Sequence, residues 1–407
     1  MPFEWFVALR YLREGRMQTA LILGAVAIGV AVVVFLSALI SGLQANLIDK
    51  TLGSQAHIIV HPPDEEARVL PSADAAGQLL DARIEKPPQR LQSIASWQSV
   101  VADIARLPGV LAAAPQVSGA AFLVRGASTR SIALRGVDPD SVSSVIGLAQ
   151  KTRAGRYQIV GAEVMLGTDL ASDFGVALGD KIRLVTASGL TDVFTVAGLF
   201  DLGSKDINQR MVLVPLRSAQ TLFDLAGGIS TIELKVGDVF GAQAVATQIT
   251  ARTGLIADSW TKTNPQLLVA LQSQESSKNV MLFFITLTVA LSIASVLIVS
   301  VIQKSREIGV MRAVGTSRSR VLRIFLIQGG LVGFSGSVLG SGLGALLARA
   351  FVGLFRTADG SPMFPIALTS ALFIGPTLLA TLVGLIAAVA PARRAARLDP
   401  AQVIRYG

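Results

Sequence analysis

The sequence predicts an α-helical membrane protein with four transmembrane helices plus a large α+β extracytoplasmic domain between helices 1 and 2. Of the 407 residues, 51% are hydrophobic and only 15% are charged, a composition too apolar for an ordinary soluble protein. Four runs without a charged residue are long enough to cross a hydrocarbon layer of about 30 Å at about 1.5 Å per residue. Lys and Arg gather beside these runs. The predicted spans are residues 18–42, 280–302, 324–348 and 366–390.

Residues 1–17 predict a helix that lies in the membrane interface before the first span. Phe3, Phe6 and Val7 recur at helical spacing, and three arginines step by three beyond them. A cleaved signal peptide is the alternative interpretation of a basic segment followed by an apolar run. The uncharged run is longer than the apolar core of such peptides, and no cleavage motif follows, which favours a retained span.

Residues 43–279 predict the extracytoplasmic domain, in which 21 Lys and Arg nearly balance 22 Asp and Glu. Helix and strand patterns at its two ends predict an α+β layer, residues 43–135 and 226–279. The strand-rich middle, residues 136–225, predicts an inserted β-rich subdomain.

Local patterns place several elements in this domain. Helices are expected at residues 97–106 and 240–251. Strands are expected at residues 117–124, 130–134, 181–185, 193–196, 211–214, 230–236 and 254–258. The connection at residues 187–192 predicts a tight turn between two of these strands.

The basic clusters predict the topology, because the cytoplasmic ends of transmembrane helices carry an excess of Lys and Arg. Residues 1–17, the connection 303–323 and the tail 391–407 lie on one side of a four-span chain and carry nearly all of the formal charge of +9. We therefore expect both termini in the cytoplasm, and residues 43–279 and the short loop 349–365 outside. Nucleic-acid binding would instead place the basic surface on the large soluble domain.

The sequence contains no G-x-x-x-x-G-K-[ST] phosphate loop and no G-x-S-x-G nucleophile motif. His57 and His61 would lie about 13 Å apart on a strand, too far to share a metal ion. The predicted spans contain no Asp, Glu, Lys, Arg or His, which argues against an ion-coupled pump. We therefore predict no catalytic residue, no metal and no cofactor in this chain.

Glycines in the third span recur every four residues on one helical face, at Gly336, Gly340 and Gly344. Dinucleotide binding by this glycine-rich run is the alternative, but no strand precedes it. Small residues at this spacing let helices approach closely in lipid, so we predict that the three glycines pack against another helix.

Residues 303–323 contain six basic residues and predict a short amphipathic helix between the second and third spans. Ile308, Met311 and Val314 step by three along one face, and Gly315 predicts the end of the helix. Such a helix suits docking into a groove of a partner protein, while a lipid-surface helix held by its positive charge remains the alternative. The candidate docking residues are Arg306, Glu307, Ile308, Met311, Arg312 and Gly315.

These motifs resemble the FtsX-like permease family, the ABC transporter permeases of the lipoprotein-releasing and macrolide-exporter type. REIGVMRAVGTSRSRV (residues 306–321) is similar to their cytoplasmic coupling segment, and FLIQGGLVGFSGSVLGSGLGALLA (325–348) to their glycine-rich third span. PARRAARLDPAQVIRYG (391–407) resembles their C-terminal signature. ALRYLR (8–13) and IGVAVVVFLSALISGLQANL (28–47) resemble the lipoprotein-releasing branch, and FGVALGDKIRLV (174–185) carries a looser likeness in the outer domain.

The resemblance implies a mechanotransmission permease in a bacterial inner membrane, paired with a second, identical or related permease. A separate cytoplasmic ABC ATPase dimer would bind ATP and Mg, and its motion would pass through the membrane to the outer domains. The N-terminal resemblance favours lipoprotein or lipid as cargo, in contact with membrane lipids and with a periplasmic carrier protein. The alternatives are a tripartite exporter with a periplasmic adaptor, and a signalling permease that activates a cell-wall hydrolase. Carrier-using members have a long loop between the two strands here, whereas residues 187–192 predict a tight turn, which argues against carrier handover by this subunit.

Overall fold

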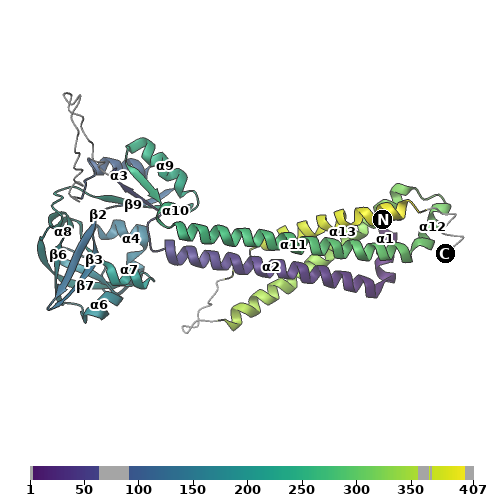
Figure 1. Cartoon of the computed structure of the whole chain (residues 1–407), viewed down its shortest axis with the longest axis horizontal. Helices are drawn as coiled ribbons and strands as arrows, with labels where there is room; N and C mark the ends of the chain where they lie inside the picture. Colours follow the sequence, from purple (N-terminus) through teal and green to yellow (C-terminus); the bar gives the residue numbers. More distant parts are fainter. Residues whose placement is uncertain (1–2, 64–90, 356–365, 367–368, 399–407) are drawn as a thin grey trace, which may run out of the picture. The chain divides into compact units, whose positions relative to one another are not determined.

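The computed structural model describes residues 3–63, 91–355, 366 and 369–398, which form two compact units (Figure 1). The membrane unit consists of Met1–Asn46 and Val269–Gly407, and the outer unit of Leu47–Leu268. The predicted tail beyond residue 398 and most of the predicted loop 349–365 lie outside the described residues.

The helices of the membrane unit overlap the predicted spans; α2, α11 and α13 extend beyond them at both ends, whereas α14 begins only at Ala371, inside the predicted span 366–390. They are α1 (Phe3–Glu14), α2 (Arg16–Leu52), α11 (Pro265–Gln303), α12 (Ser305–Ala313), α13 (Arg318–Leu354) and α14 (Ala371–Ala396). Within the described residues, α2, α11, α13 and α14 are long and apolar enough to cross a membrane, which confirms the four predicted spans. The extra length of α2 and α11 carries the chain into the outer unit.

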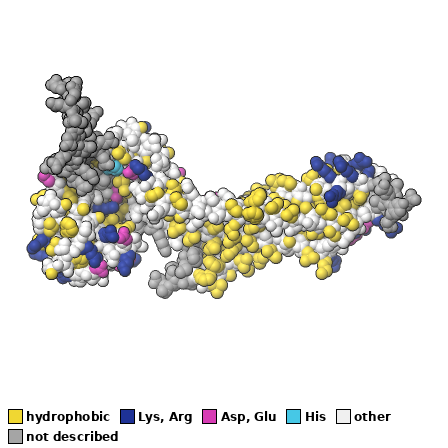
Figure 2. All heavy atoms as spheres, viewed as in Figure 1, with side chains coloured by type: hydrophobic (Ala, Val, Ile, Leu, Met, Phe, Trp, Pro, Cys, Tyr) yellow, Lys and Arg dark blue, Asp and Glu magenta, His cyan; other side chains and the backbone are white. Residues whose placement is uncertain are grey.

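The four long helices pack through apolar stripes at helical spacing. Val289, Ile293 and Leu297 of α11 are buried together with Val26 and Val30 of α2. Side chains on the opposite faces of the same helices are exposed, as expected for surfaces that meet lipid. Figure 2 shows hydrophobic side chains over most of the visible face of the membrane unit, with Lys and Arg gathered at one end.

The outer unit contains the rest of the regular structure. Its strands are β1 (Ile58–His61), β2 (Val110–Arg125), β3 (Ser128–Val137), β4 (Thr152–Gly155), β5 (Glu163–Gly167), β6 (Lys181–Thr186), β7 (Thr191–Phe200), β8 (Met211–Pro215), β9 (Thr231–Val236) and β10 (Ile256–Ser259). Its helices are α3 (Trp97–Ala105), α4 (Pro139–Ile146), α5 (Leu148–Lys151), α6 (Thr168–Phe174), α7 (Lys205–Arg210), α8 (Leu216–Leu222), α9 (Ala242–Thr253) and α10 (Trp260–Thr263).

Strand pairing closes part of the sheet into a barrel. In order around it, β2, β3, β8, β5, β7 and β6 each pair with the next, and β6 pairs back onto β2. Apolar side chains from these strands fill the interior, among them Leu123, Leu134, Leu184, Phe194 and Val212. Strands from residues 136–225, predicted as an inserted β-rich subdomain, close this barrel together with β2 and β3, which begin before residue 136.

Apart from β4, which pairs with β7 of the barrel, the remaining strands form the layer at the other end of β2. The order is β10, β1, β9 and then the first half of β2, all antiparallel. A buried ion pair crosses this junction: Arg135 Nη1 of β3 donates to Glu233 Oε1 of β9 at 2.7 Å, with the Glu233 side chain only 2% exposed. It ties a strand of the layer to a strand of the barrel.

The predicted elements of the outer unit recur in the structure with shifted ends. The predicted helix at residues 97–106 is α3, and the predicted helix at 240–251 is α9. Each predicted strand overlaps one of β2, β3, β6, β7, β8, β9 and β10. The turn between β6 and β7 is tight, with the Thr186 N–H donating to the Leu190 carbonyl and Gly189 at a φ of 84°.

Candidate functional site

The connection between α11 and α13 forms a short helix, α12, with a defined end. Gly315 adopts a φ of 101°, and the Thr316 N–H donates to the Met311 carbonyl at 3.0 Å, which is the Schellman geometry. Ser317 begins α13, where its Oγ accepts from the Arg320 N–H at 3.4 Å. The end of α12 at Gly315 agrees with the sequence pattern.

The face of α12 that is exposed differs from the docking face predicted from the sequence. Ile308 is fully buried and Met311 is half-buried, and both pack inside the chain against α1, α13 and α14. Val314, predicted on the same face, is 84% exposed instead. The prediction that Ile308 and Met311 form an external docking face is therefore wrong, because neighbouring helices of the same chain already cover them.

The guanidinium of Arg312 also has its hydrogen-bond partners within the chain. Its Nη1 donates to the main-chain carbonyls of Ala396 at 3.1 Å and Leu398 at 2.6 Å, at the end of α14. A cation at this position also interacts favourably with the negative end of the helix dipole. Arg312 thereby attaches α12 to the C-terminal end of α14.

The outward face of α12 carries a different residue set. Arg306, Glu307 and Gly315 are exposed, and two valines one helical turn apart, Val310 and Val314, are 50% and 84% exposed. Exposed valines flanked by charged side chains suit a groove on another protein. Val310 and Val314 are four residues apart, about one helical turn. This spacing could have identified the outward face, but the prediction followed the three-residue step from Ile308 to Met311 and Val314.

An ion-pair network joins α12 to α1. Lys304 Nζ donates to Glu14 Oε2 and to Glu307 Oε1, both at 2.7 Å, and Arg10 Nε donates to Glu14 Oε1 at 2.7 Å. Hydrogen bonds from Lys304 and from Arg10 lower the pKa of the Glu14 carboxyl to about 2. Burial raises the pKa of the Tyr11 hydroxyl to about 12, and the Lys304 ammonium lies 5.4 Å from the centre of the Tyr11 ring. α1 and α12 are thus held together at neutral pH.

The glycines of the third span lie against α2. A Cβ at Gly336 would approach Val26 Cγ1 to 2.7 Å, and one at Gly344 would approach the Ala31 carbonyl oxygen to 2.9 Å. At Gly340 the distance to the Ala27 carbonyl oxygen would be 2.5 Å. Each position therefore needs the absence of a side chain for the two helices to come this close.

A second glycine face of α13, which the sequence reading missed, lies against α14. A Cβ at Gly329 would lie 2.5 Å from the Gly384 carbonyl oxygen, and one at Gly333 would lie 2.5 Å from that of Ala380. Gly329 and Gly333 are four residues apart, which is the signal that could have identified this face. The third span is packed closely on both sides.

The outer end of α2 is held by Lys151, the last residue of α5. Its Nζ donates to the Gly53 carbonyl at 3.0 Å and to Ser54 Oγ at 2.5 Å, and Ser54 Oγ donates to the Leu202 carbonyl at 2.8 Å. Burial lowers the pKa of the Lys151 ammonium. Lys151 at the end of α5 and Leu202 after β7 thereby fix the segment that directly follows α2.

Changing Lys151 to Met should loosen this joint. The variant loses two hydrogen bonds from a charged donor, each of a kind that contributes about 1.5–3 kcal/mol. We expect faster amide hydrogen exchange over residues 47–54 in the full-length protein. Lys181→Met, at an exposed lysine of β6, should leave this exchange unchanged. Equal protection of residues 47–54 in wild type and Lys151→Met would contradict the assignment.

The two histidines have separate partners. His57 is buried with Nδ1 3.1 Å from the Val236 carbonyl oxygen, and His61 Nε2 lies 3.3 Å from Asp258 Oδ2. Burial lowers the pKa of His57. Across the described part of the chain, no group of three or more His, Cys, Asp or Glu side chains is arranged to hold a metal ion.

Comparison with known protein families matches nearly the whole chain. Residues 19–252 match the model of the MacB-like periplasmic core domain, and residues 279–400 match the FtsX-like permease C-terminal model. The lipoprotein-releasing system transmembrane protein LolC of Xylella fastidiosa is 28% identical over 100% of this chain and 99% of its own length. The macrolide export ATP-binding/permease protein MacB of Hyphomonas neptunium is 27% identical over 97% of this chain, which spans 59% of that protein. The crystal structure of the periplasmic region of MacB from Actinobacillus actinomycetemcomitans covers 55% of this chain at 14% identity, with a TM-score of 0.34.

Proposed function

From the premise that the chain belongs to the FtsX-like permeases with a MacB-like periplasmic core domain, we propose that it transmits the motion of a separate cytoplasmic ATPase to its periplasmic domain. It is an ABC transporter permease of the type that includes LolC, LolE and MacB, and a multi-pass membrane protein with a periplasmic domain. In the proposed role, ATP and Mg are bound by an ATPase dimer, and both termini and α12 lie in the cytoplasm.

This proposal is supported by the residues on the two faces of α12. Its outward face offers Arg306, Glu307, Val310 and Val314 to an ATPase. Its inward face is attached to α1 through Lys304 and Glu14, to α14 through Arg312, and to α13 through the buried side chain of Ile308. A push on α12 would therefore move three other helices with it, which is what a transmission element requires.

The cargo of the proposed transporter is amphiphilic, with lipoprotein or lipid as the preferred class. Support comes from relatives named as lipoprotein-releasing transmembrane proteins, which align with this chain over nearly their full length. A second permease, identical or related, completes the complex, and the exposed apolar faces of α2 and α11 offer surface for it and for membrane lipids.

A tripartite exporter is the second candidate, because relatives named as macrolide exporters also align over most of this chain. In that role a periplasmic adaptor replaces the carrier. A signalling permease that activates a periplasmic cell-wall hydrolase is a further alternative. Affinity purification of the complex, with identification of the bound proteins, distinguishes the three functions. A bound lipoprotein carrier indicates lipoprotein release, an adaptor indicates a tripartite exporter, and a hydrolase indicates a signalling permease.

Changing Val310 and Val314 together to Asp should uncouple the permease from its ATPase. Both side chains are exposed, so the fold tolerates the change, while two carboxylates entering an apolar groove lose affinity because their charge must be desolvated. We expect the double variant to insert normally and to lose at least about tenfold in ATPase binding, equivalent to about 1.4 kcal/mol. The measurement is ATPase co-purification and stimulation.

Two controls make this test specific. Gln303→Asp adds a charge at an exposed position just before α12 and should leave ATPase binding unchanged. Ile308→Asp with Met311→Asp should instead reduce the amount of folded protein, because it places carboxylates in a closed apolar cluster. If the Val310 and Val314 double variant stimulates the ATPase as well as wild type does, α12 does not bind the ATPase through this face and is a membrane-surface helix.

A further inference from the structure

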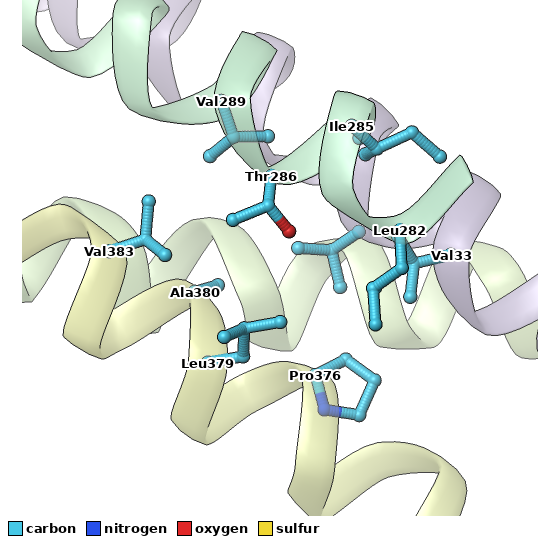
Figure 3. A pocket seen from close by; sticks show the side chains of 11 residues that line it. Val33, Leu282, Ile285, Thr286, Val289, Pro376, Leu379, Ala380 and Val383 are labelled. Atoms are coloured by element: carbon cyan, nitrogen blue, oxygen red, sulfur yellow. The ribbon is translucent and has the colours of Figure 1, made fainter. Parts of the chain in front are cut away.

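A groove runs between α2, α11 and α14 on the membrane unit. Its inner part is narrow, and Figure 3 shows side chains entering it from three helices, among them Val33, Leu282 and Leu379. Pro376 lines the same part. Apart from Thr286, the labelled side chains in this view are apolar, so the inner groove suits a hydrocarbon chain.

The groove widens towards the outer ends of the same helices. This part has a volume of about 570 Å³ and shares Val33, Leu282, Pro376 and Leu379 with the inner part. Its wall includes polar groups as well, from Ser37, Ser41 and Lys278. A wide, mainly apolar mouth with a few polar groups therefore continues into a narrow apolar part.

The polar groups of the mouth come from residues at the outer boundary of the predicted spans. Lys278 lies two residues before the second predicted span, and Ser41 is next to the last residue of the first. A lysine at this level lies among lipid headgroups, while groups deeper along the helices meet acyl chains. The side chain of Lys278 is 28% exposed and pairs with Glu275 at 2.7 Å. An ammonium has three N–H donors, so it can also bond a phosphate oxygen.

We propose that this groove is a binding site for one anionic phospholipid of the surrounding bilayer, with its phosphate at Lys278 and one acyl chain in the channel between Leu282 and Leu379. The lipid belongs to the leaflet on the side of the outer domain. The apolar walls of the groove match an acyl chain, and the Lys278 ammonium at its outer part matches a phosphate. The site is independent of the proposed transport function.

The test uses the full-length protein in bilayer nanodiscs that contain phosphatidylglycerol and phosphatidylcholine. Either lipid carries a photoactivatable group on an acyl chain, and mass spectrometry locates the labelled residues. We expect labelling of residues 282–289 and 376–383, with phosphatidylglycerol preferred about fivefold because one lysine near the membrane surface favours an anionic lipid by this factor. Equal labelling by both lipids would mean contact with bulk bilayer only and would overturn the proposal.

Matched variants separate the groove from the rest of the membrane surface. Gly375 lines the wide part, and a Cβ there meets nothing within 4 Å, so Gly375→Trp should fill the groove and remove the labelling. Gly342→Trp is the control, since Gly342 lies on an exposed face of α13 with equally open surroundings. Retained labelling in Gly375→Trp, or cross-linking of these residues to a second copy of the chain, would also overturn the proposal.

The charge is tested without filling the groove. Lys278→Gln should abolish the preference for phosphatidylglycerol, a loss of about fivefold, while acyl-chain labelling by phosphatidylcholine persists. Arg349→Gln, at an exposed arginine near the outer end of α13, should keep the preference. An unchanged preference in Lys278→Gln would show that the lysine does not select the lipid.

Discussion

Gly340→Leu should destabilise the membrane unit and stop the transmission of ATP-driven motion, whereas Gly342→Leu should do neither. At Gly340 even a Cβ would lie 2.5 Å from the Ala27 carbonyl oxygen and 2.8 Å from Val30 Cβ, so α13 and α2 must move apart. At Gly342, two residues further on, nothing lies within 4 Å. We expect a cost of about 1–3 kcal/mol for the overpacked position and nearly none for the open one.

Two measurements on the complex with its ATPase check this prediction. Thermal unfolding of the permease reports the packing of α13 on α2. The ATP-dependent change in amide hydrogen exchange of the outer domain reports transmission. Gly340→Leu should lower the unfolding temperature and abolish the exchange response while the ATPase still binds ATP. An intact exchange response in a destabilised Gly340→Leu protein would show that transmission does not need the close packing of α13 on α2.

Arg135→Met should destabilise the outer unit more than the loss of any exposed ion pair in it. The change leaves Glu233, with a 2% exposed side chain, as an uncompensated buried carboxylate. Breaking a buried pair in this way costs about 3–5 kcal/mol, because the remaining charge has lost its partner and has no water. Since the pair joins β3 of the barrel to β9 of the layer, the junction between these parts should open first.

The matched control is Arg130→Met, which removes an arginine from the same strand. Arg130 pairs with Asp173 at 2.6 Å, but both side chains are more than a third exposed (38% and 35%), so the expected cost is about 0–1 kcal/mol. Pulse proteolysis in urea compares the two variants in the full-length protein. Equal stabilities would mean that the Glu233 carboxyl finds another partner or water when Arg135 is absent.

The membrane helices could be predicted from the sequence because lipid imposes a strict rule: a spanning helix must satisfy its own backbone and present apolar side chains. The orientation of α12 could not be predicted in the same way. Ile308 and Val310 are both apolar, yet α1, α13 and α14 cover the first and leave the second half exposed. Only the packing of distant segments decides which side of such a helix faces outward.

The barrel shows a similar limit. Local alternation identified β6 and β7 as a hairpin, because their pairing and turn lie within one stretch of the sequence. Closure depends on β6 meeting β2 and on the parallel pairing of β5 with β7, and neither leaves a local signature. The short helices α4 to α8 were missed for a related reason: each has only four to eight residues, and strands and turns surround it.

The pairing of β1 with β10 has a consequence for the order in which the outer domain folds. Ile58 pairs with Ser259, about two hundred residues further along the chain, and closing such a long loop is slow compared with forming a hairpin. The β2–β3 hairpin can form as soon as residue 137 has crossed the membrane. The seam between β1 and β10 must wait until the whole domain has been translocated and α11 begins to insert. During synthesis, the segment between the first span and β1 therefore stays unpaired until β10 arrives. We expect membrane proteases to cleave stalled or truncated chains in this segment, near residues 53–57.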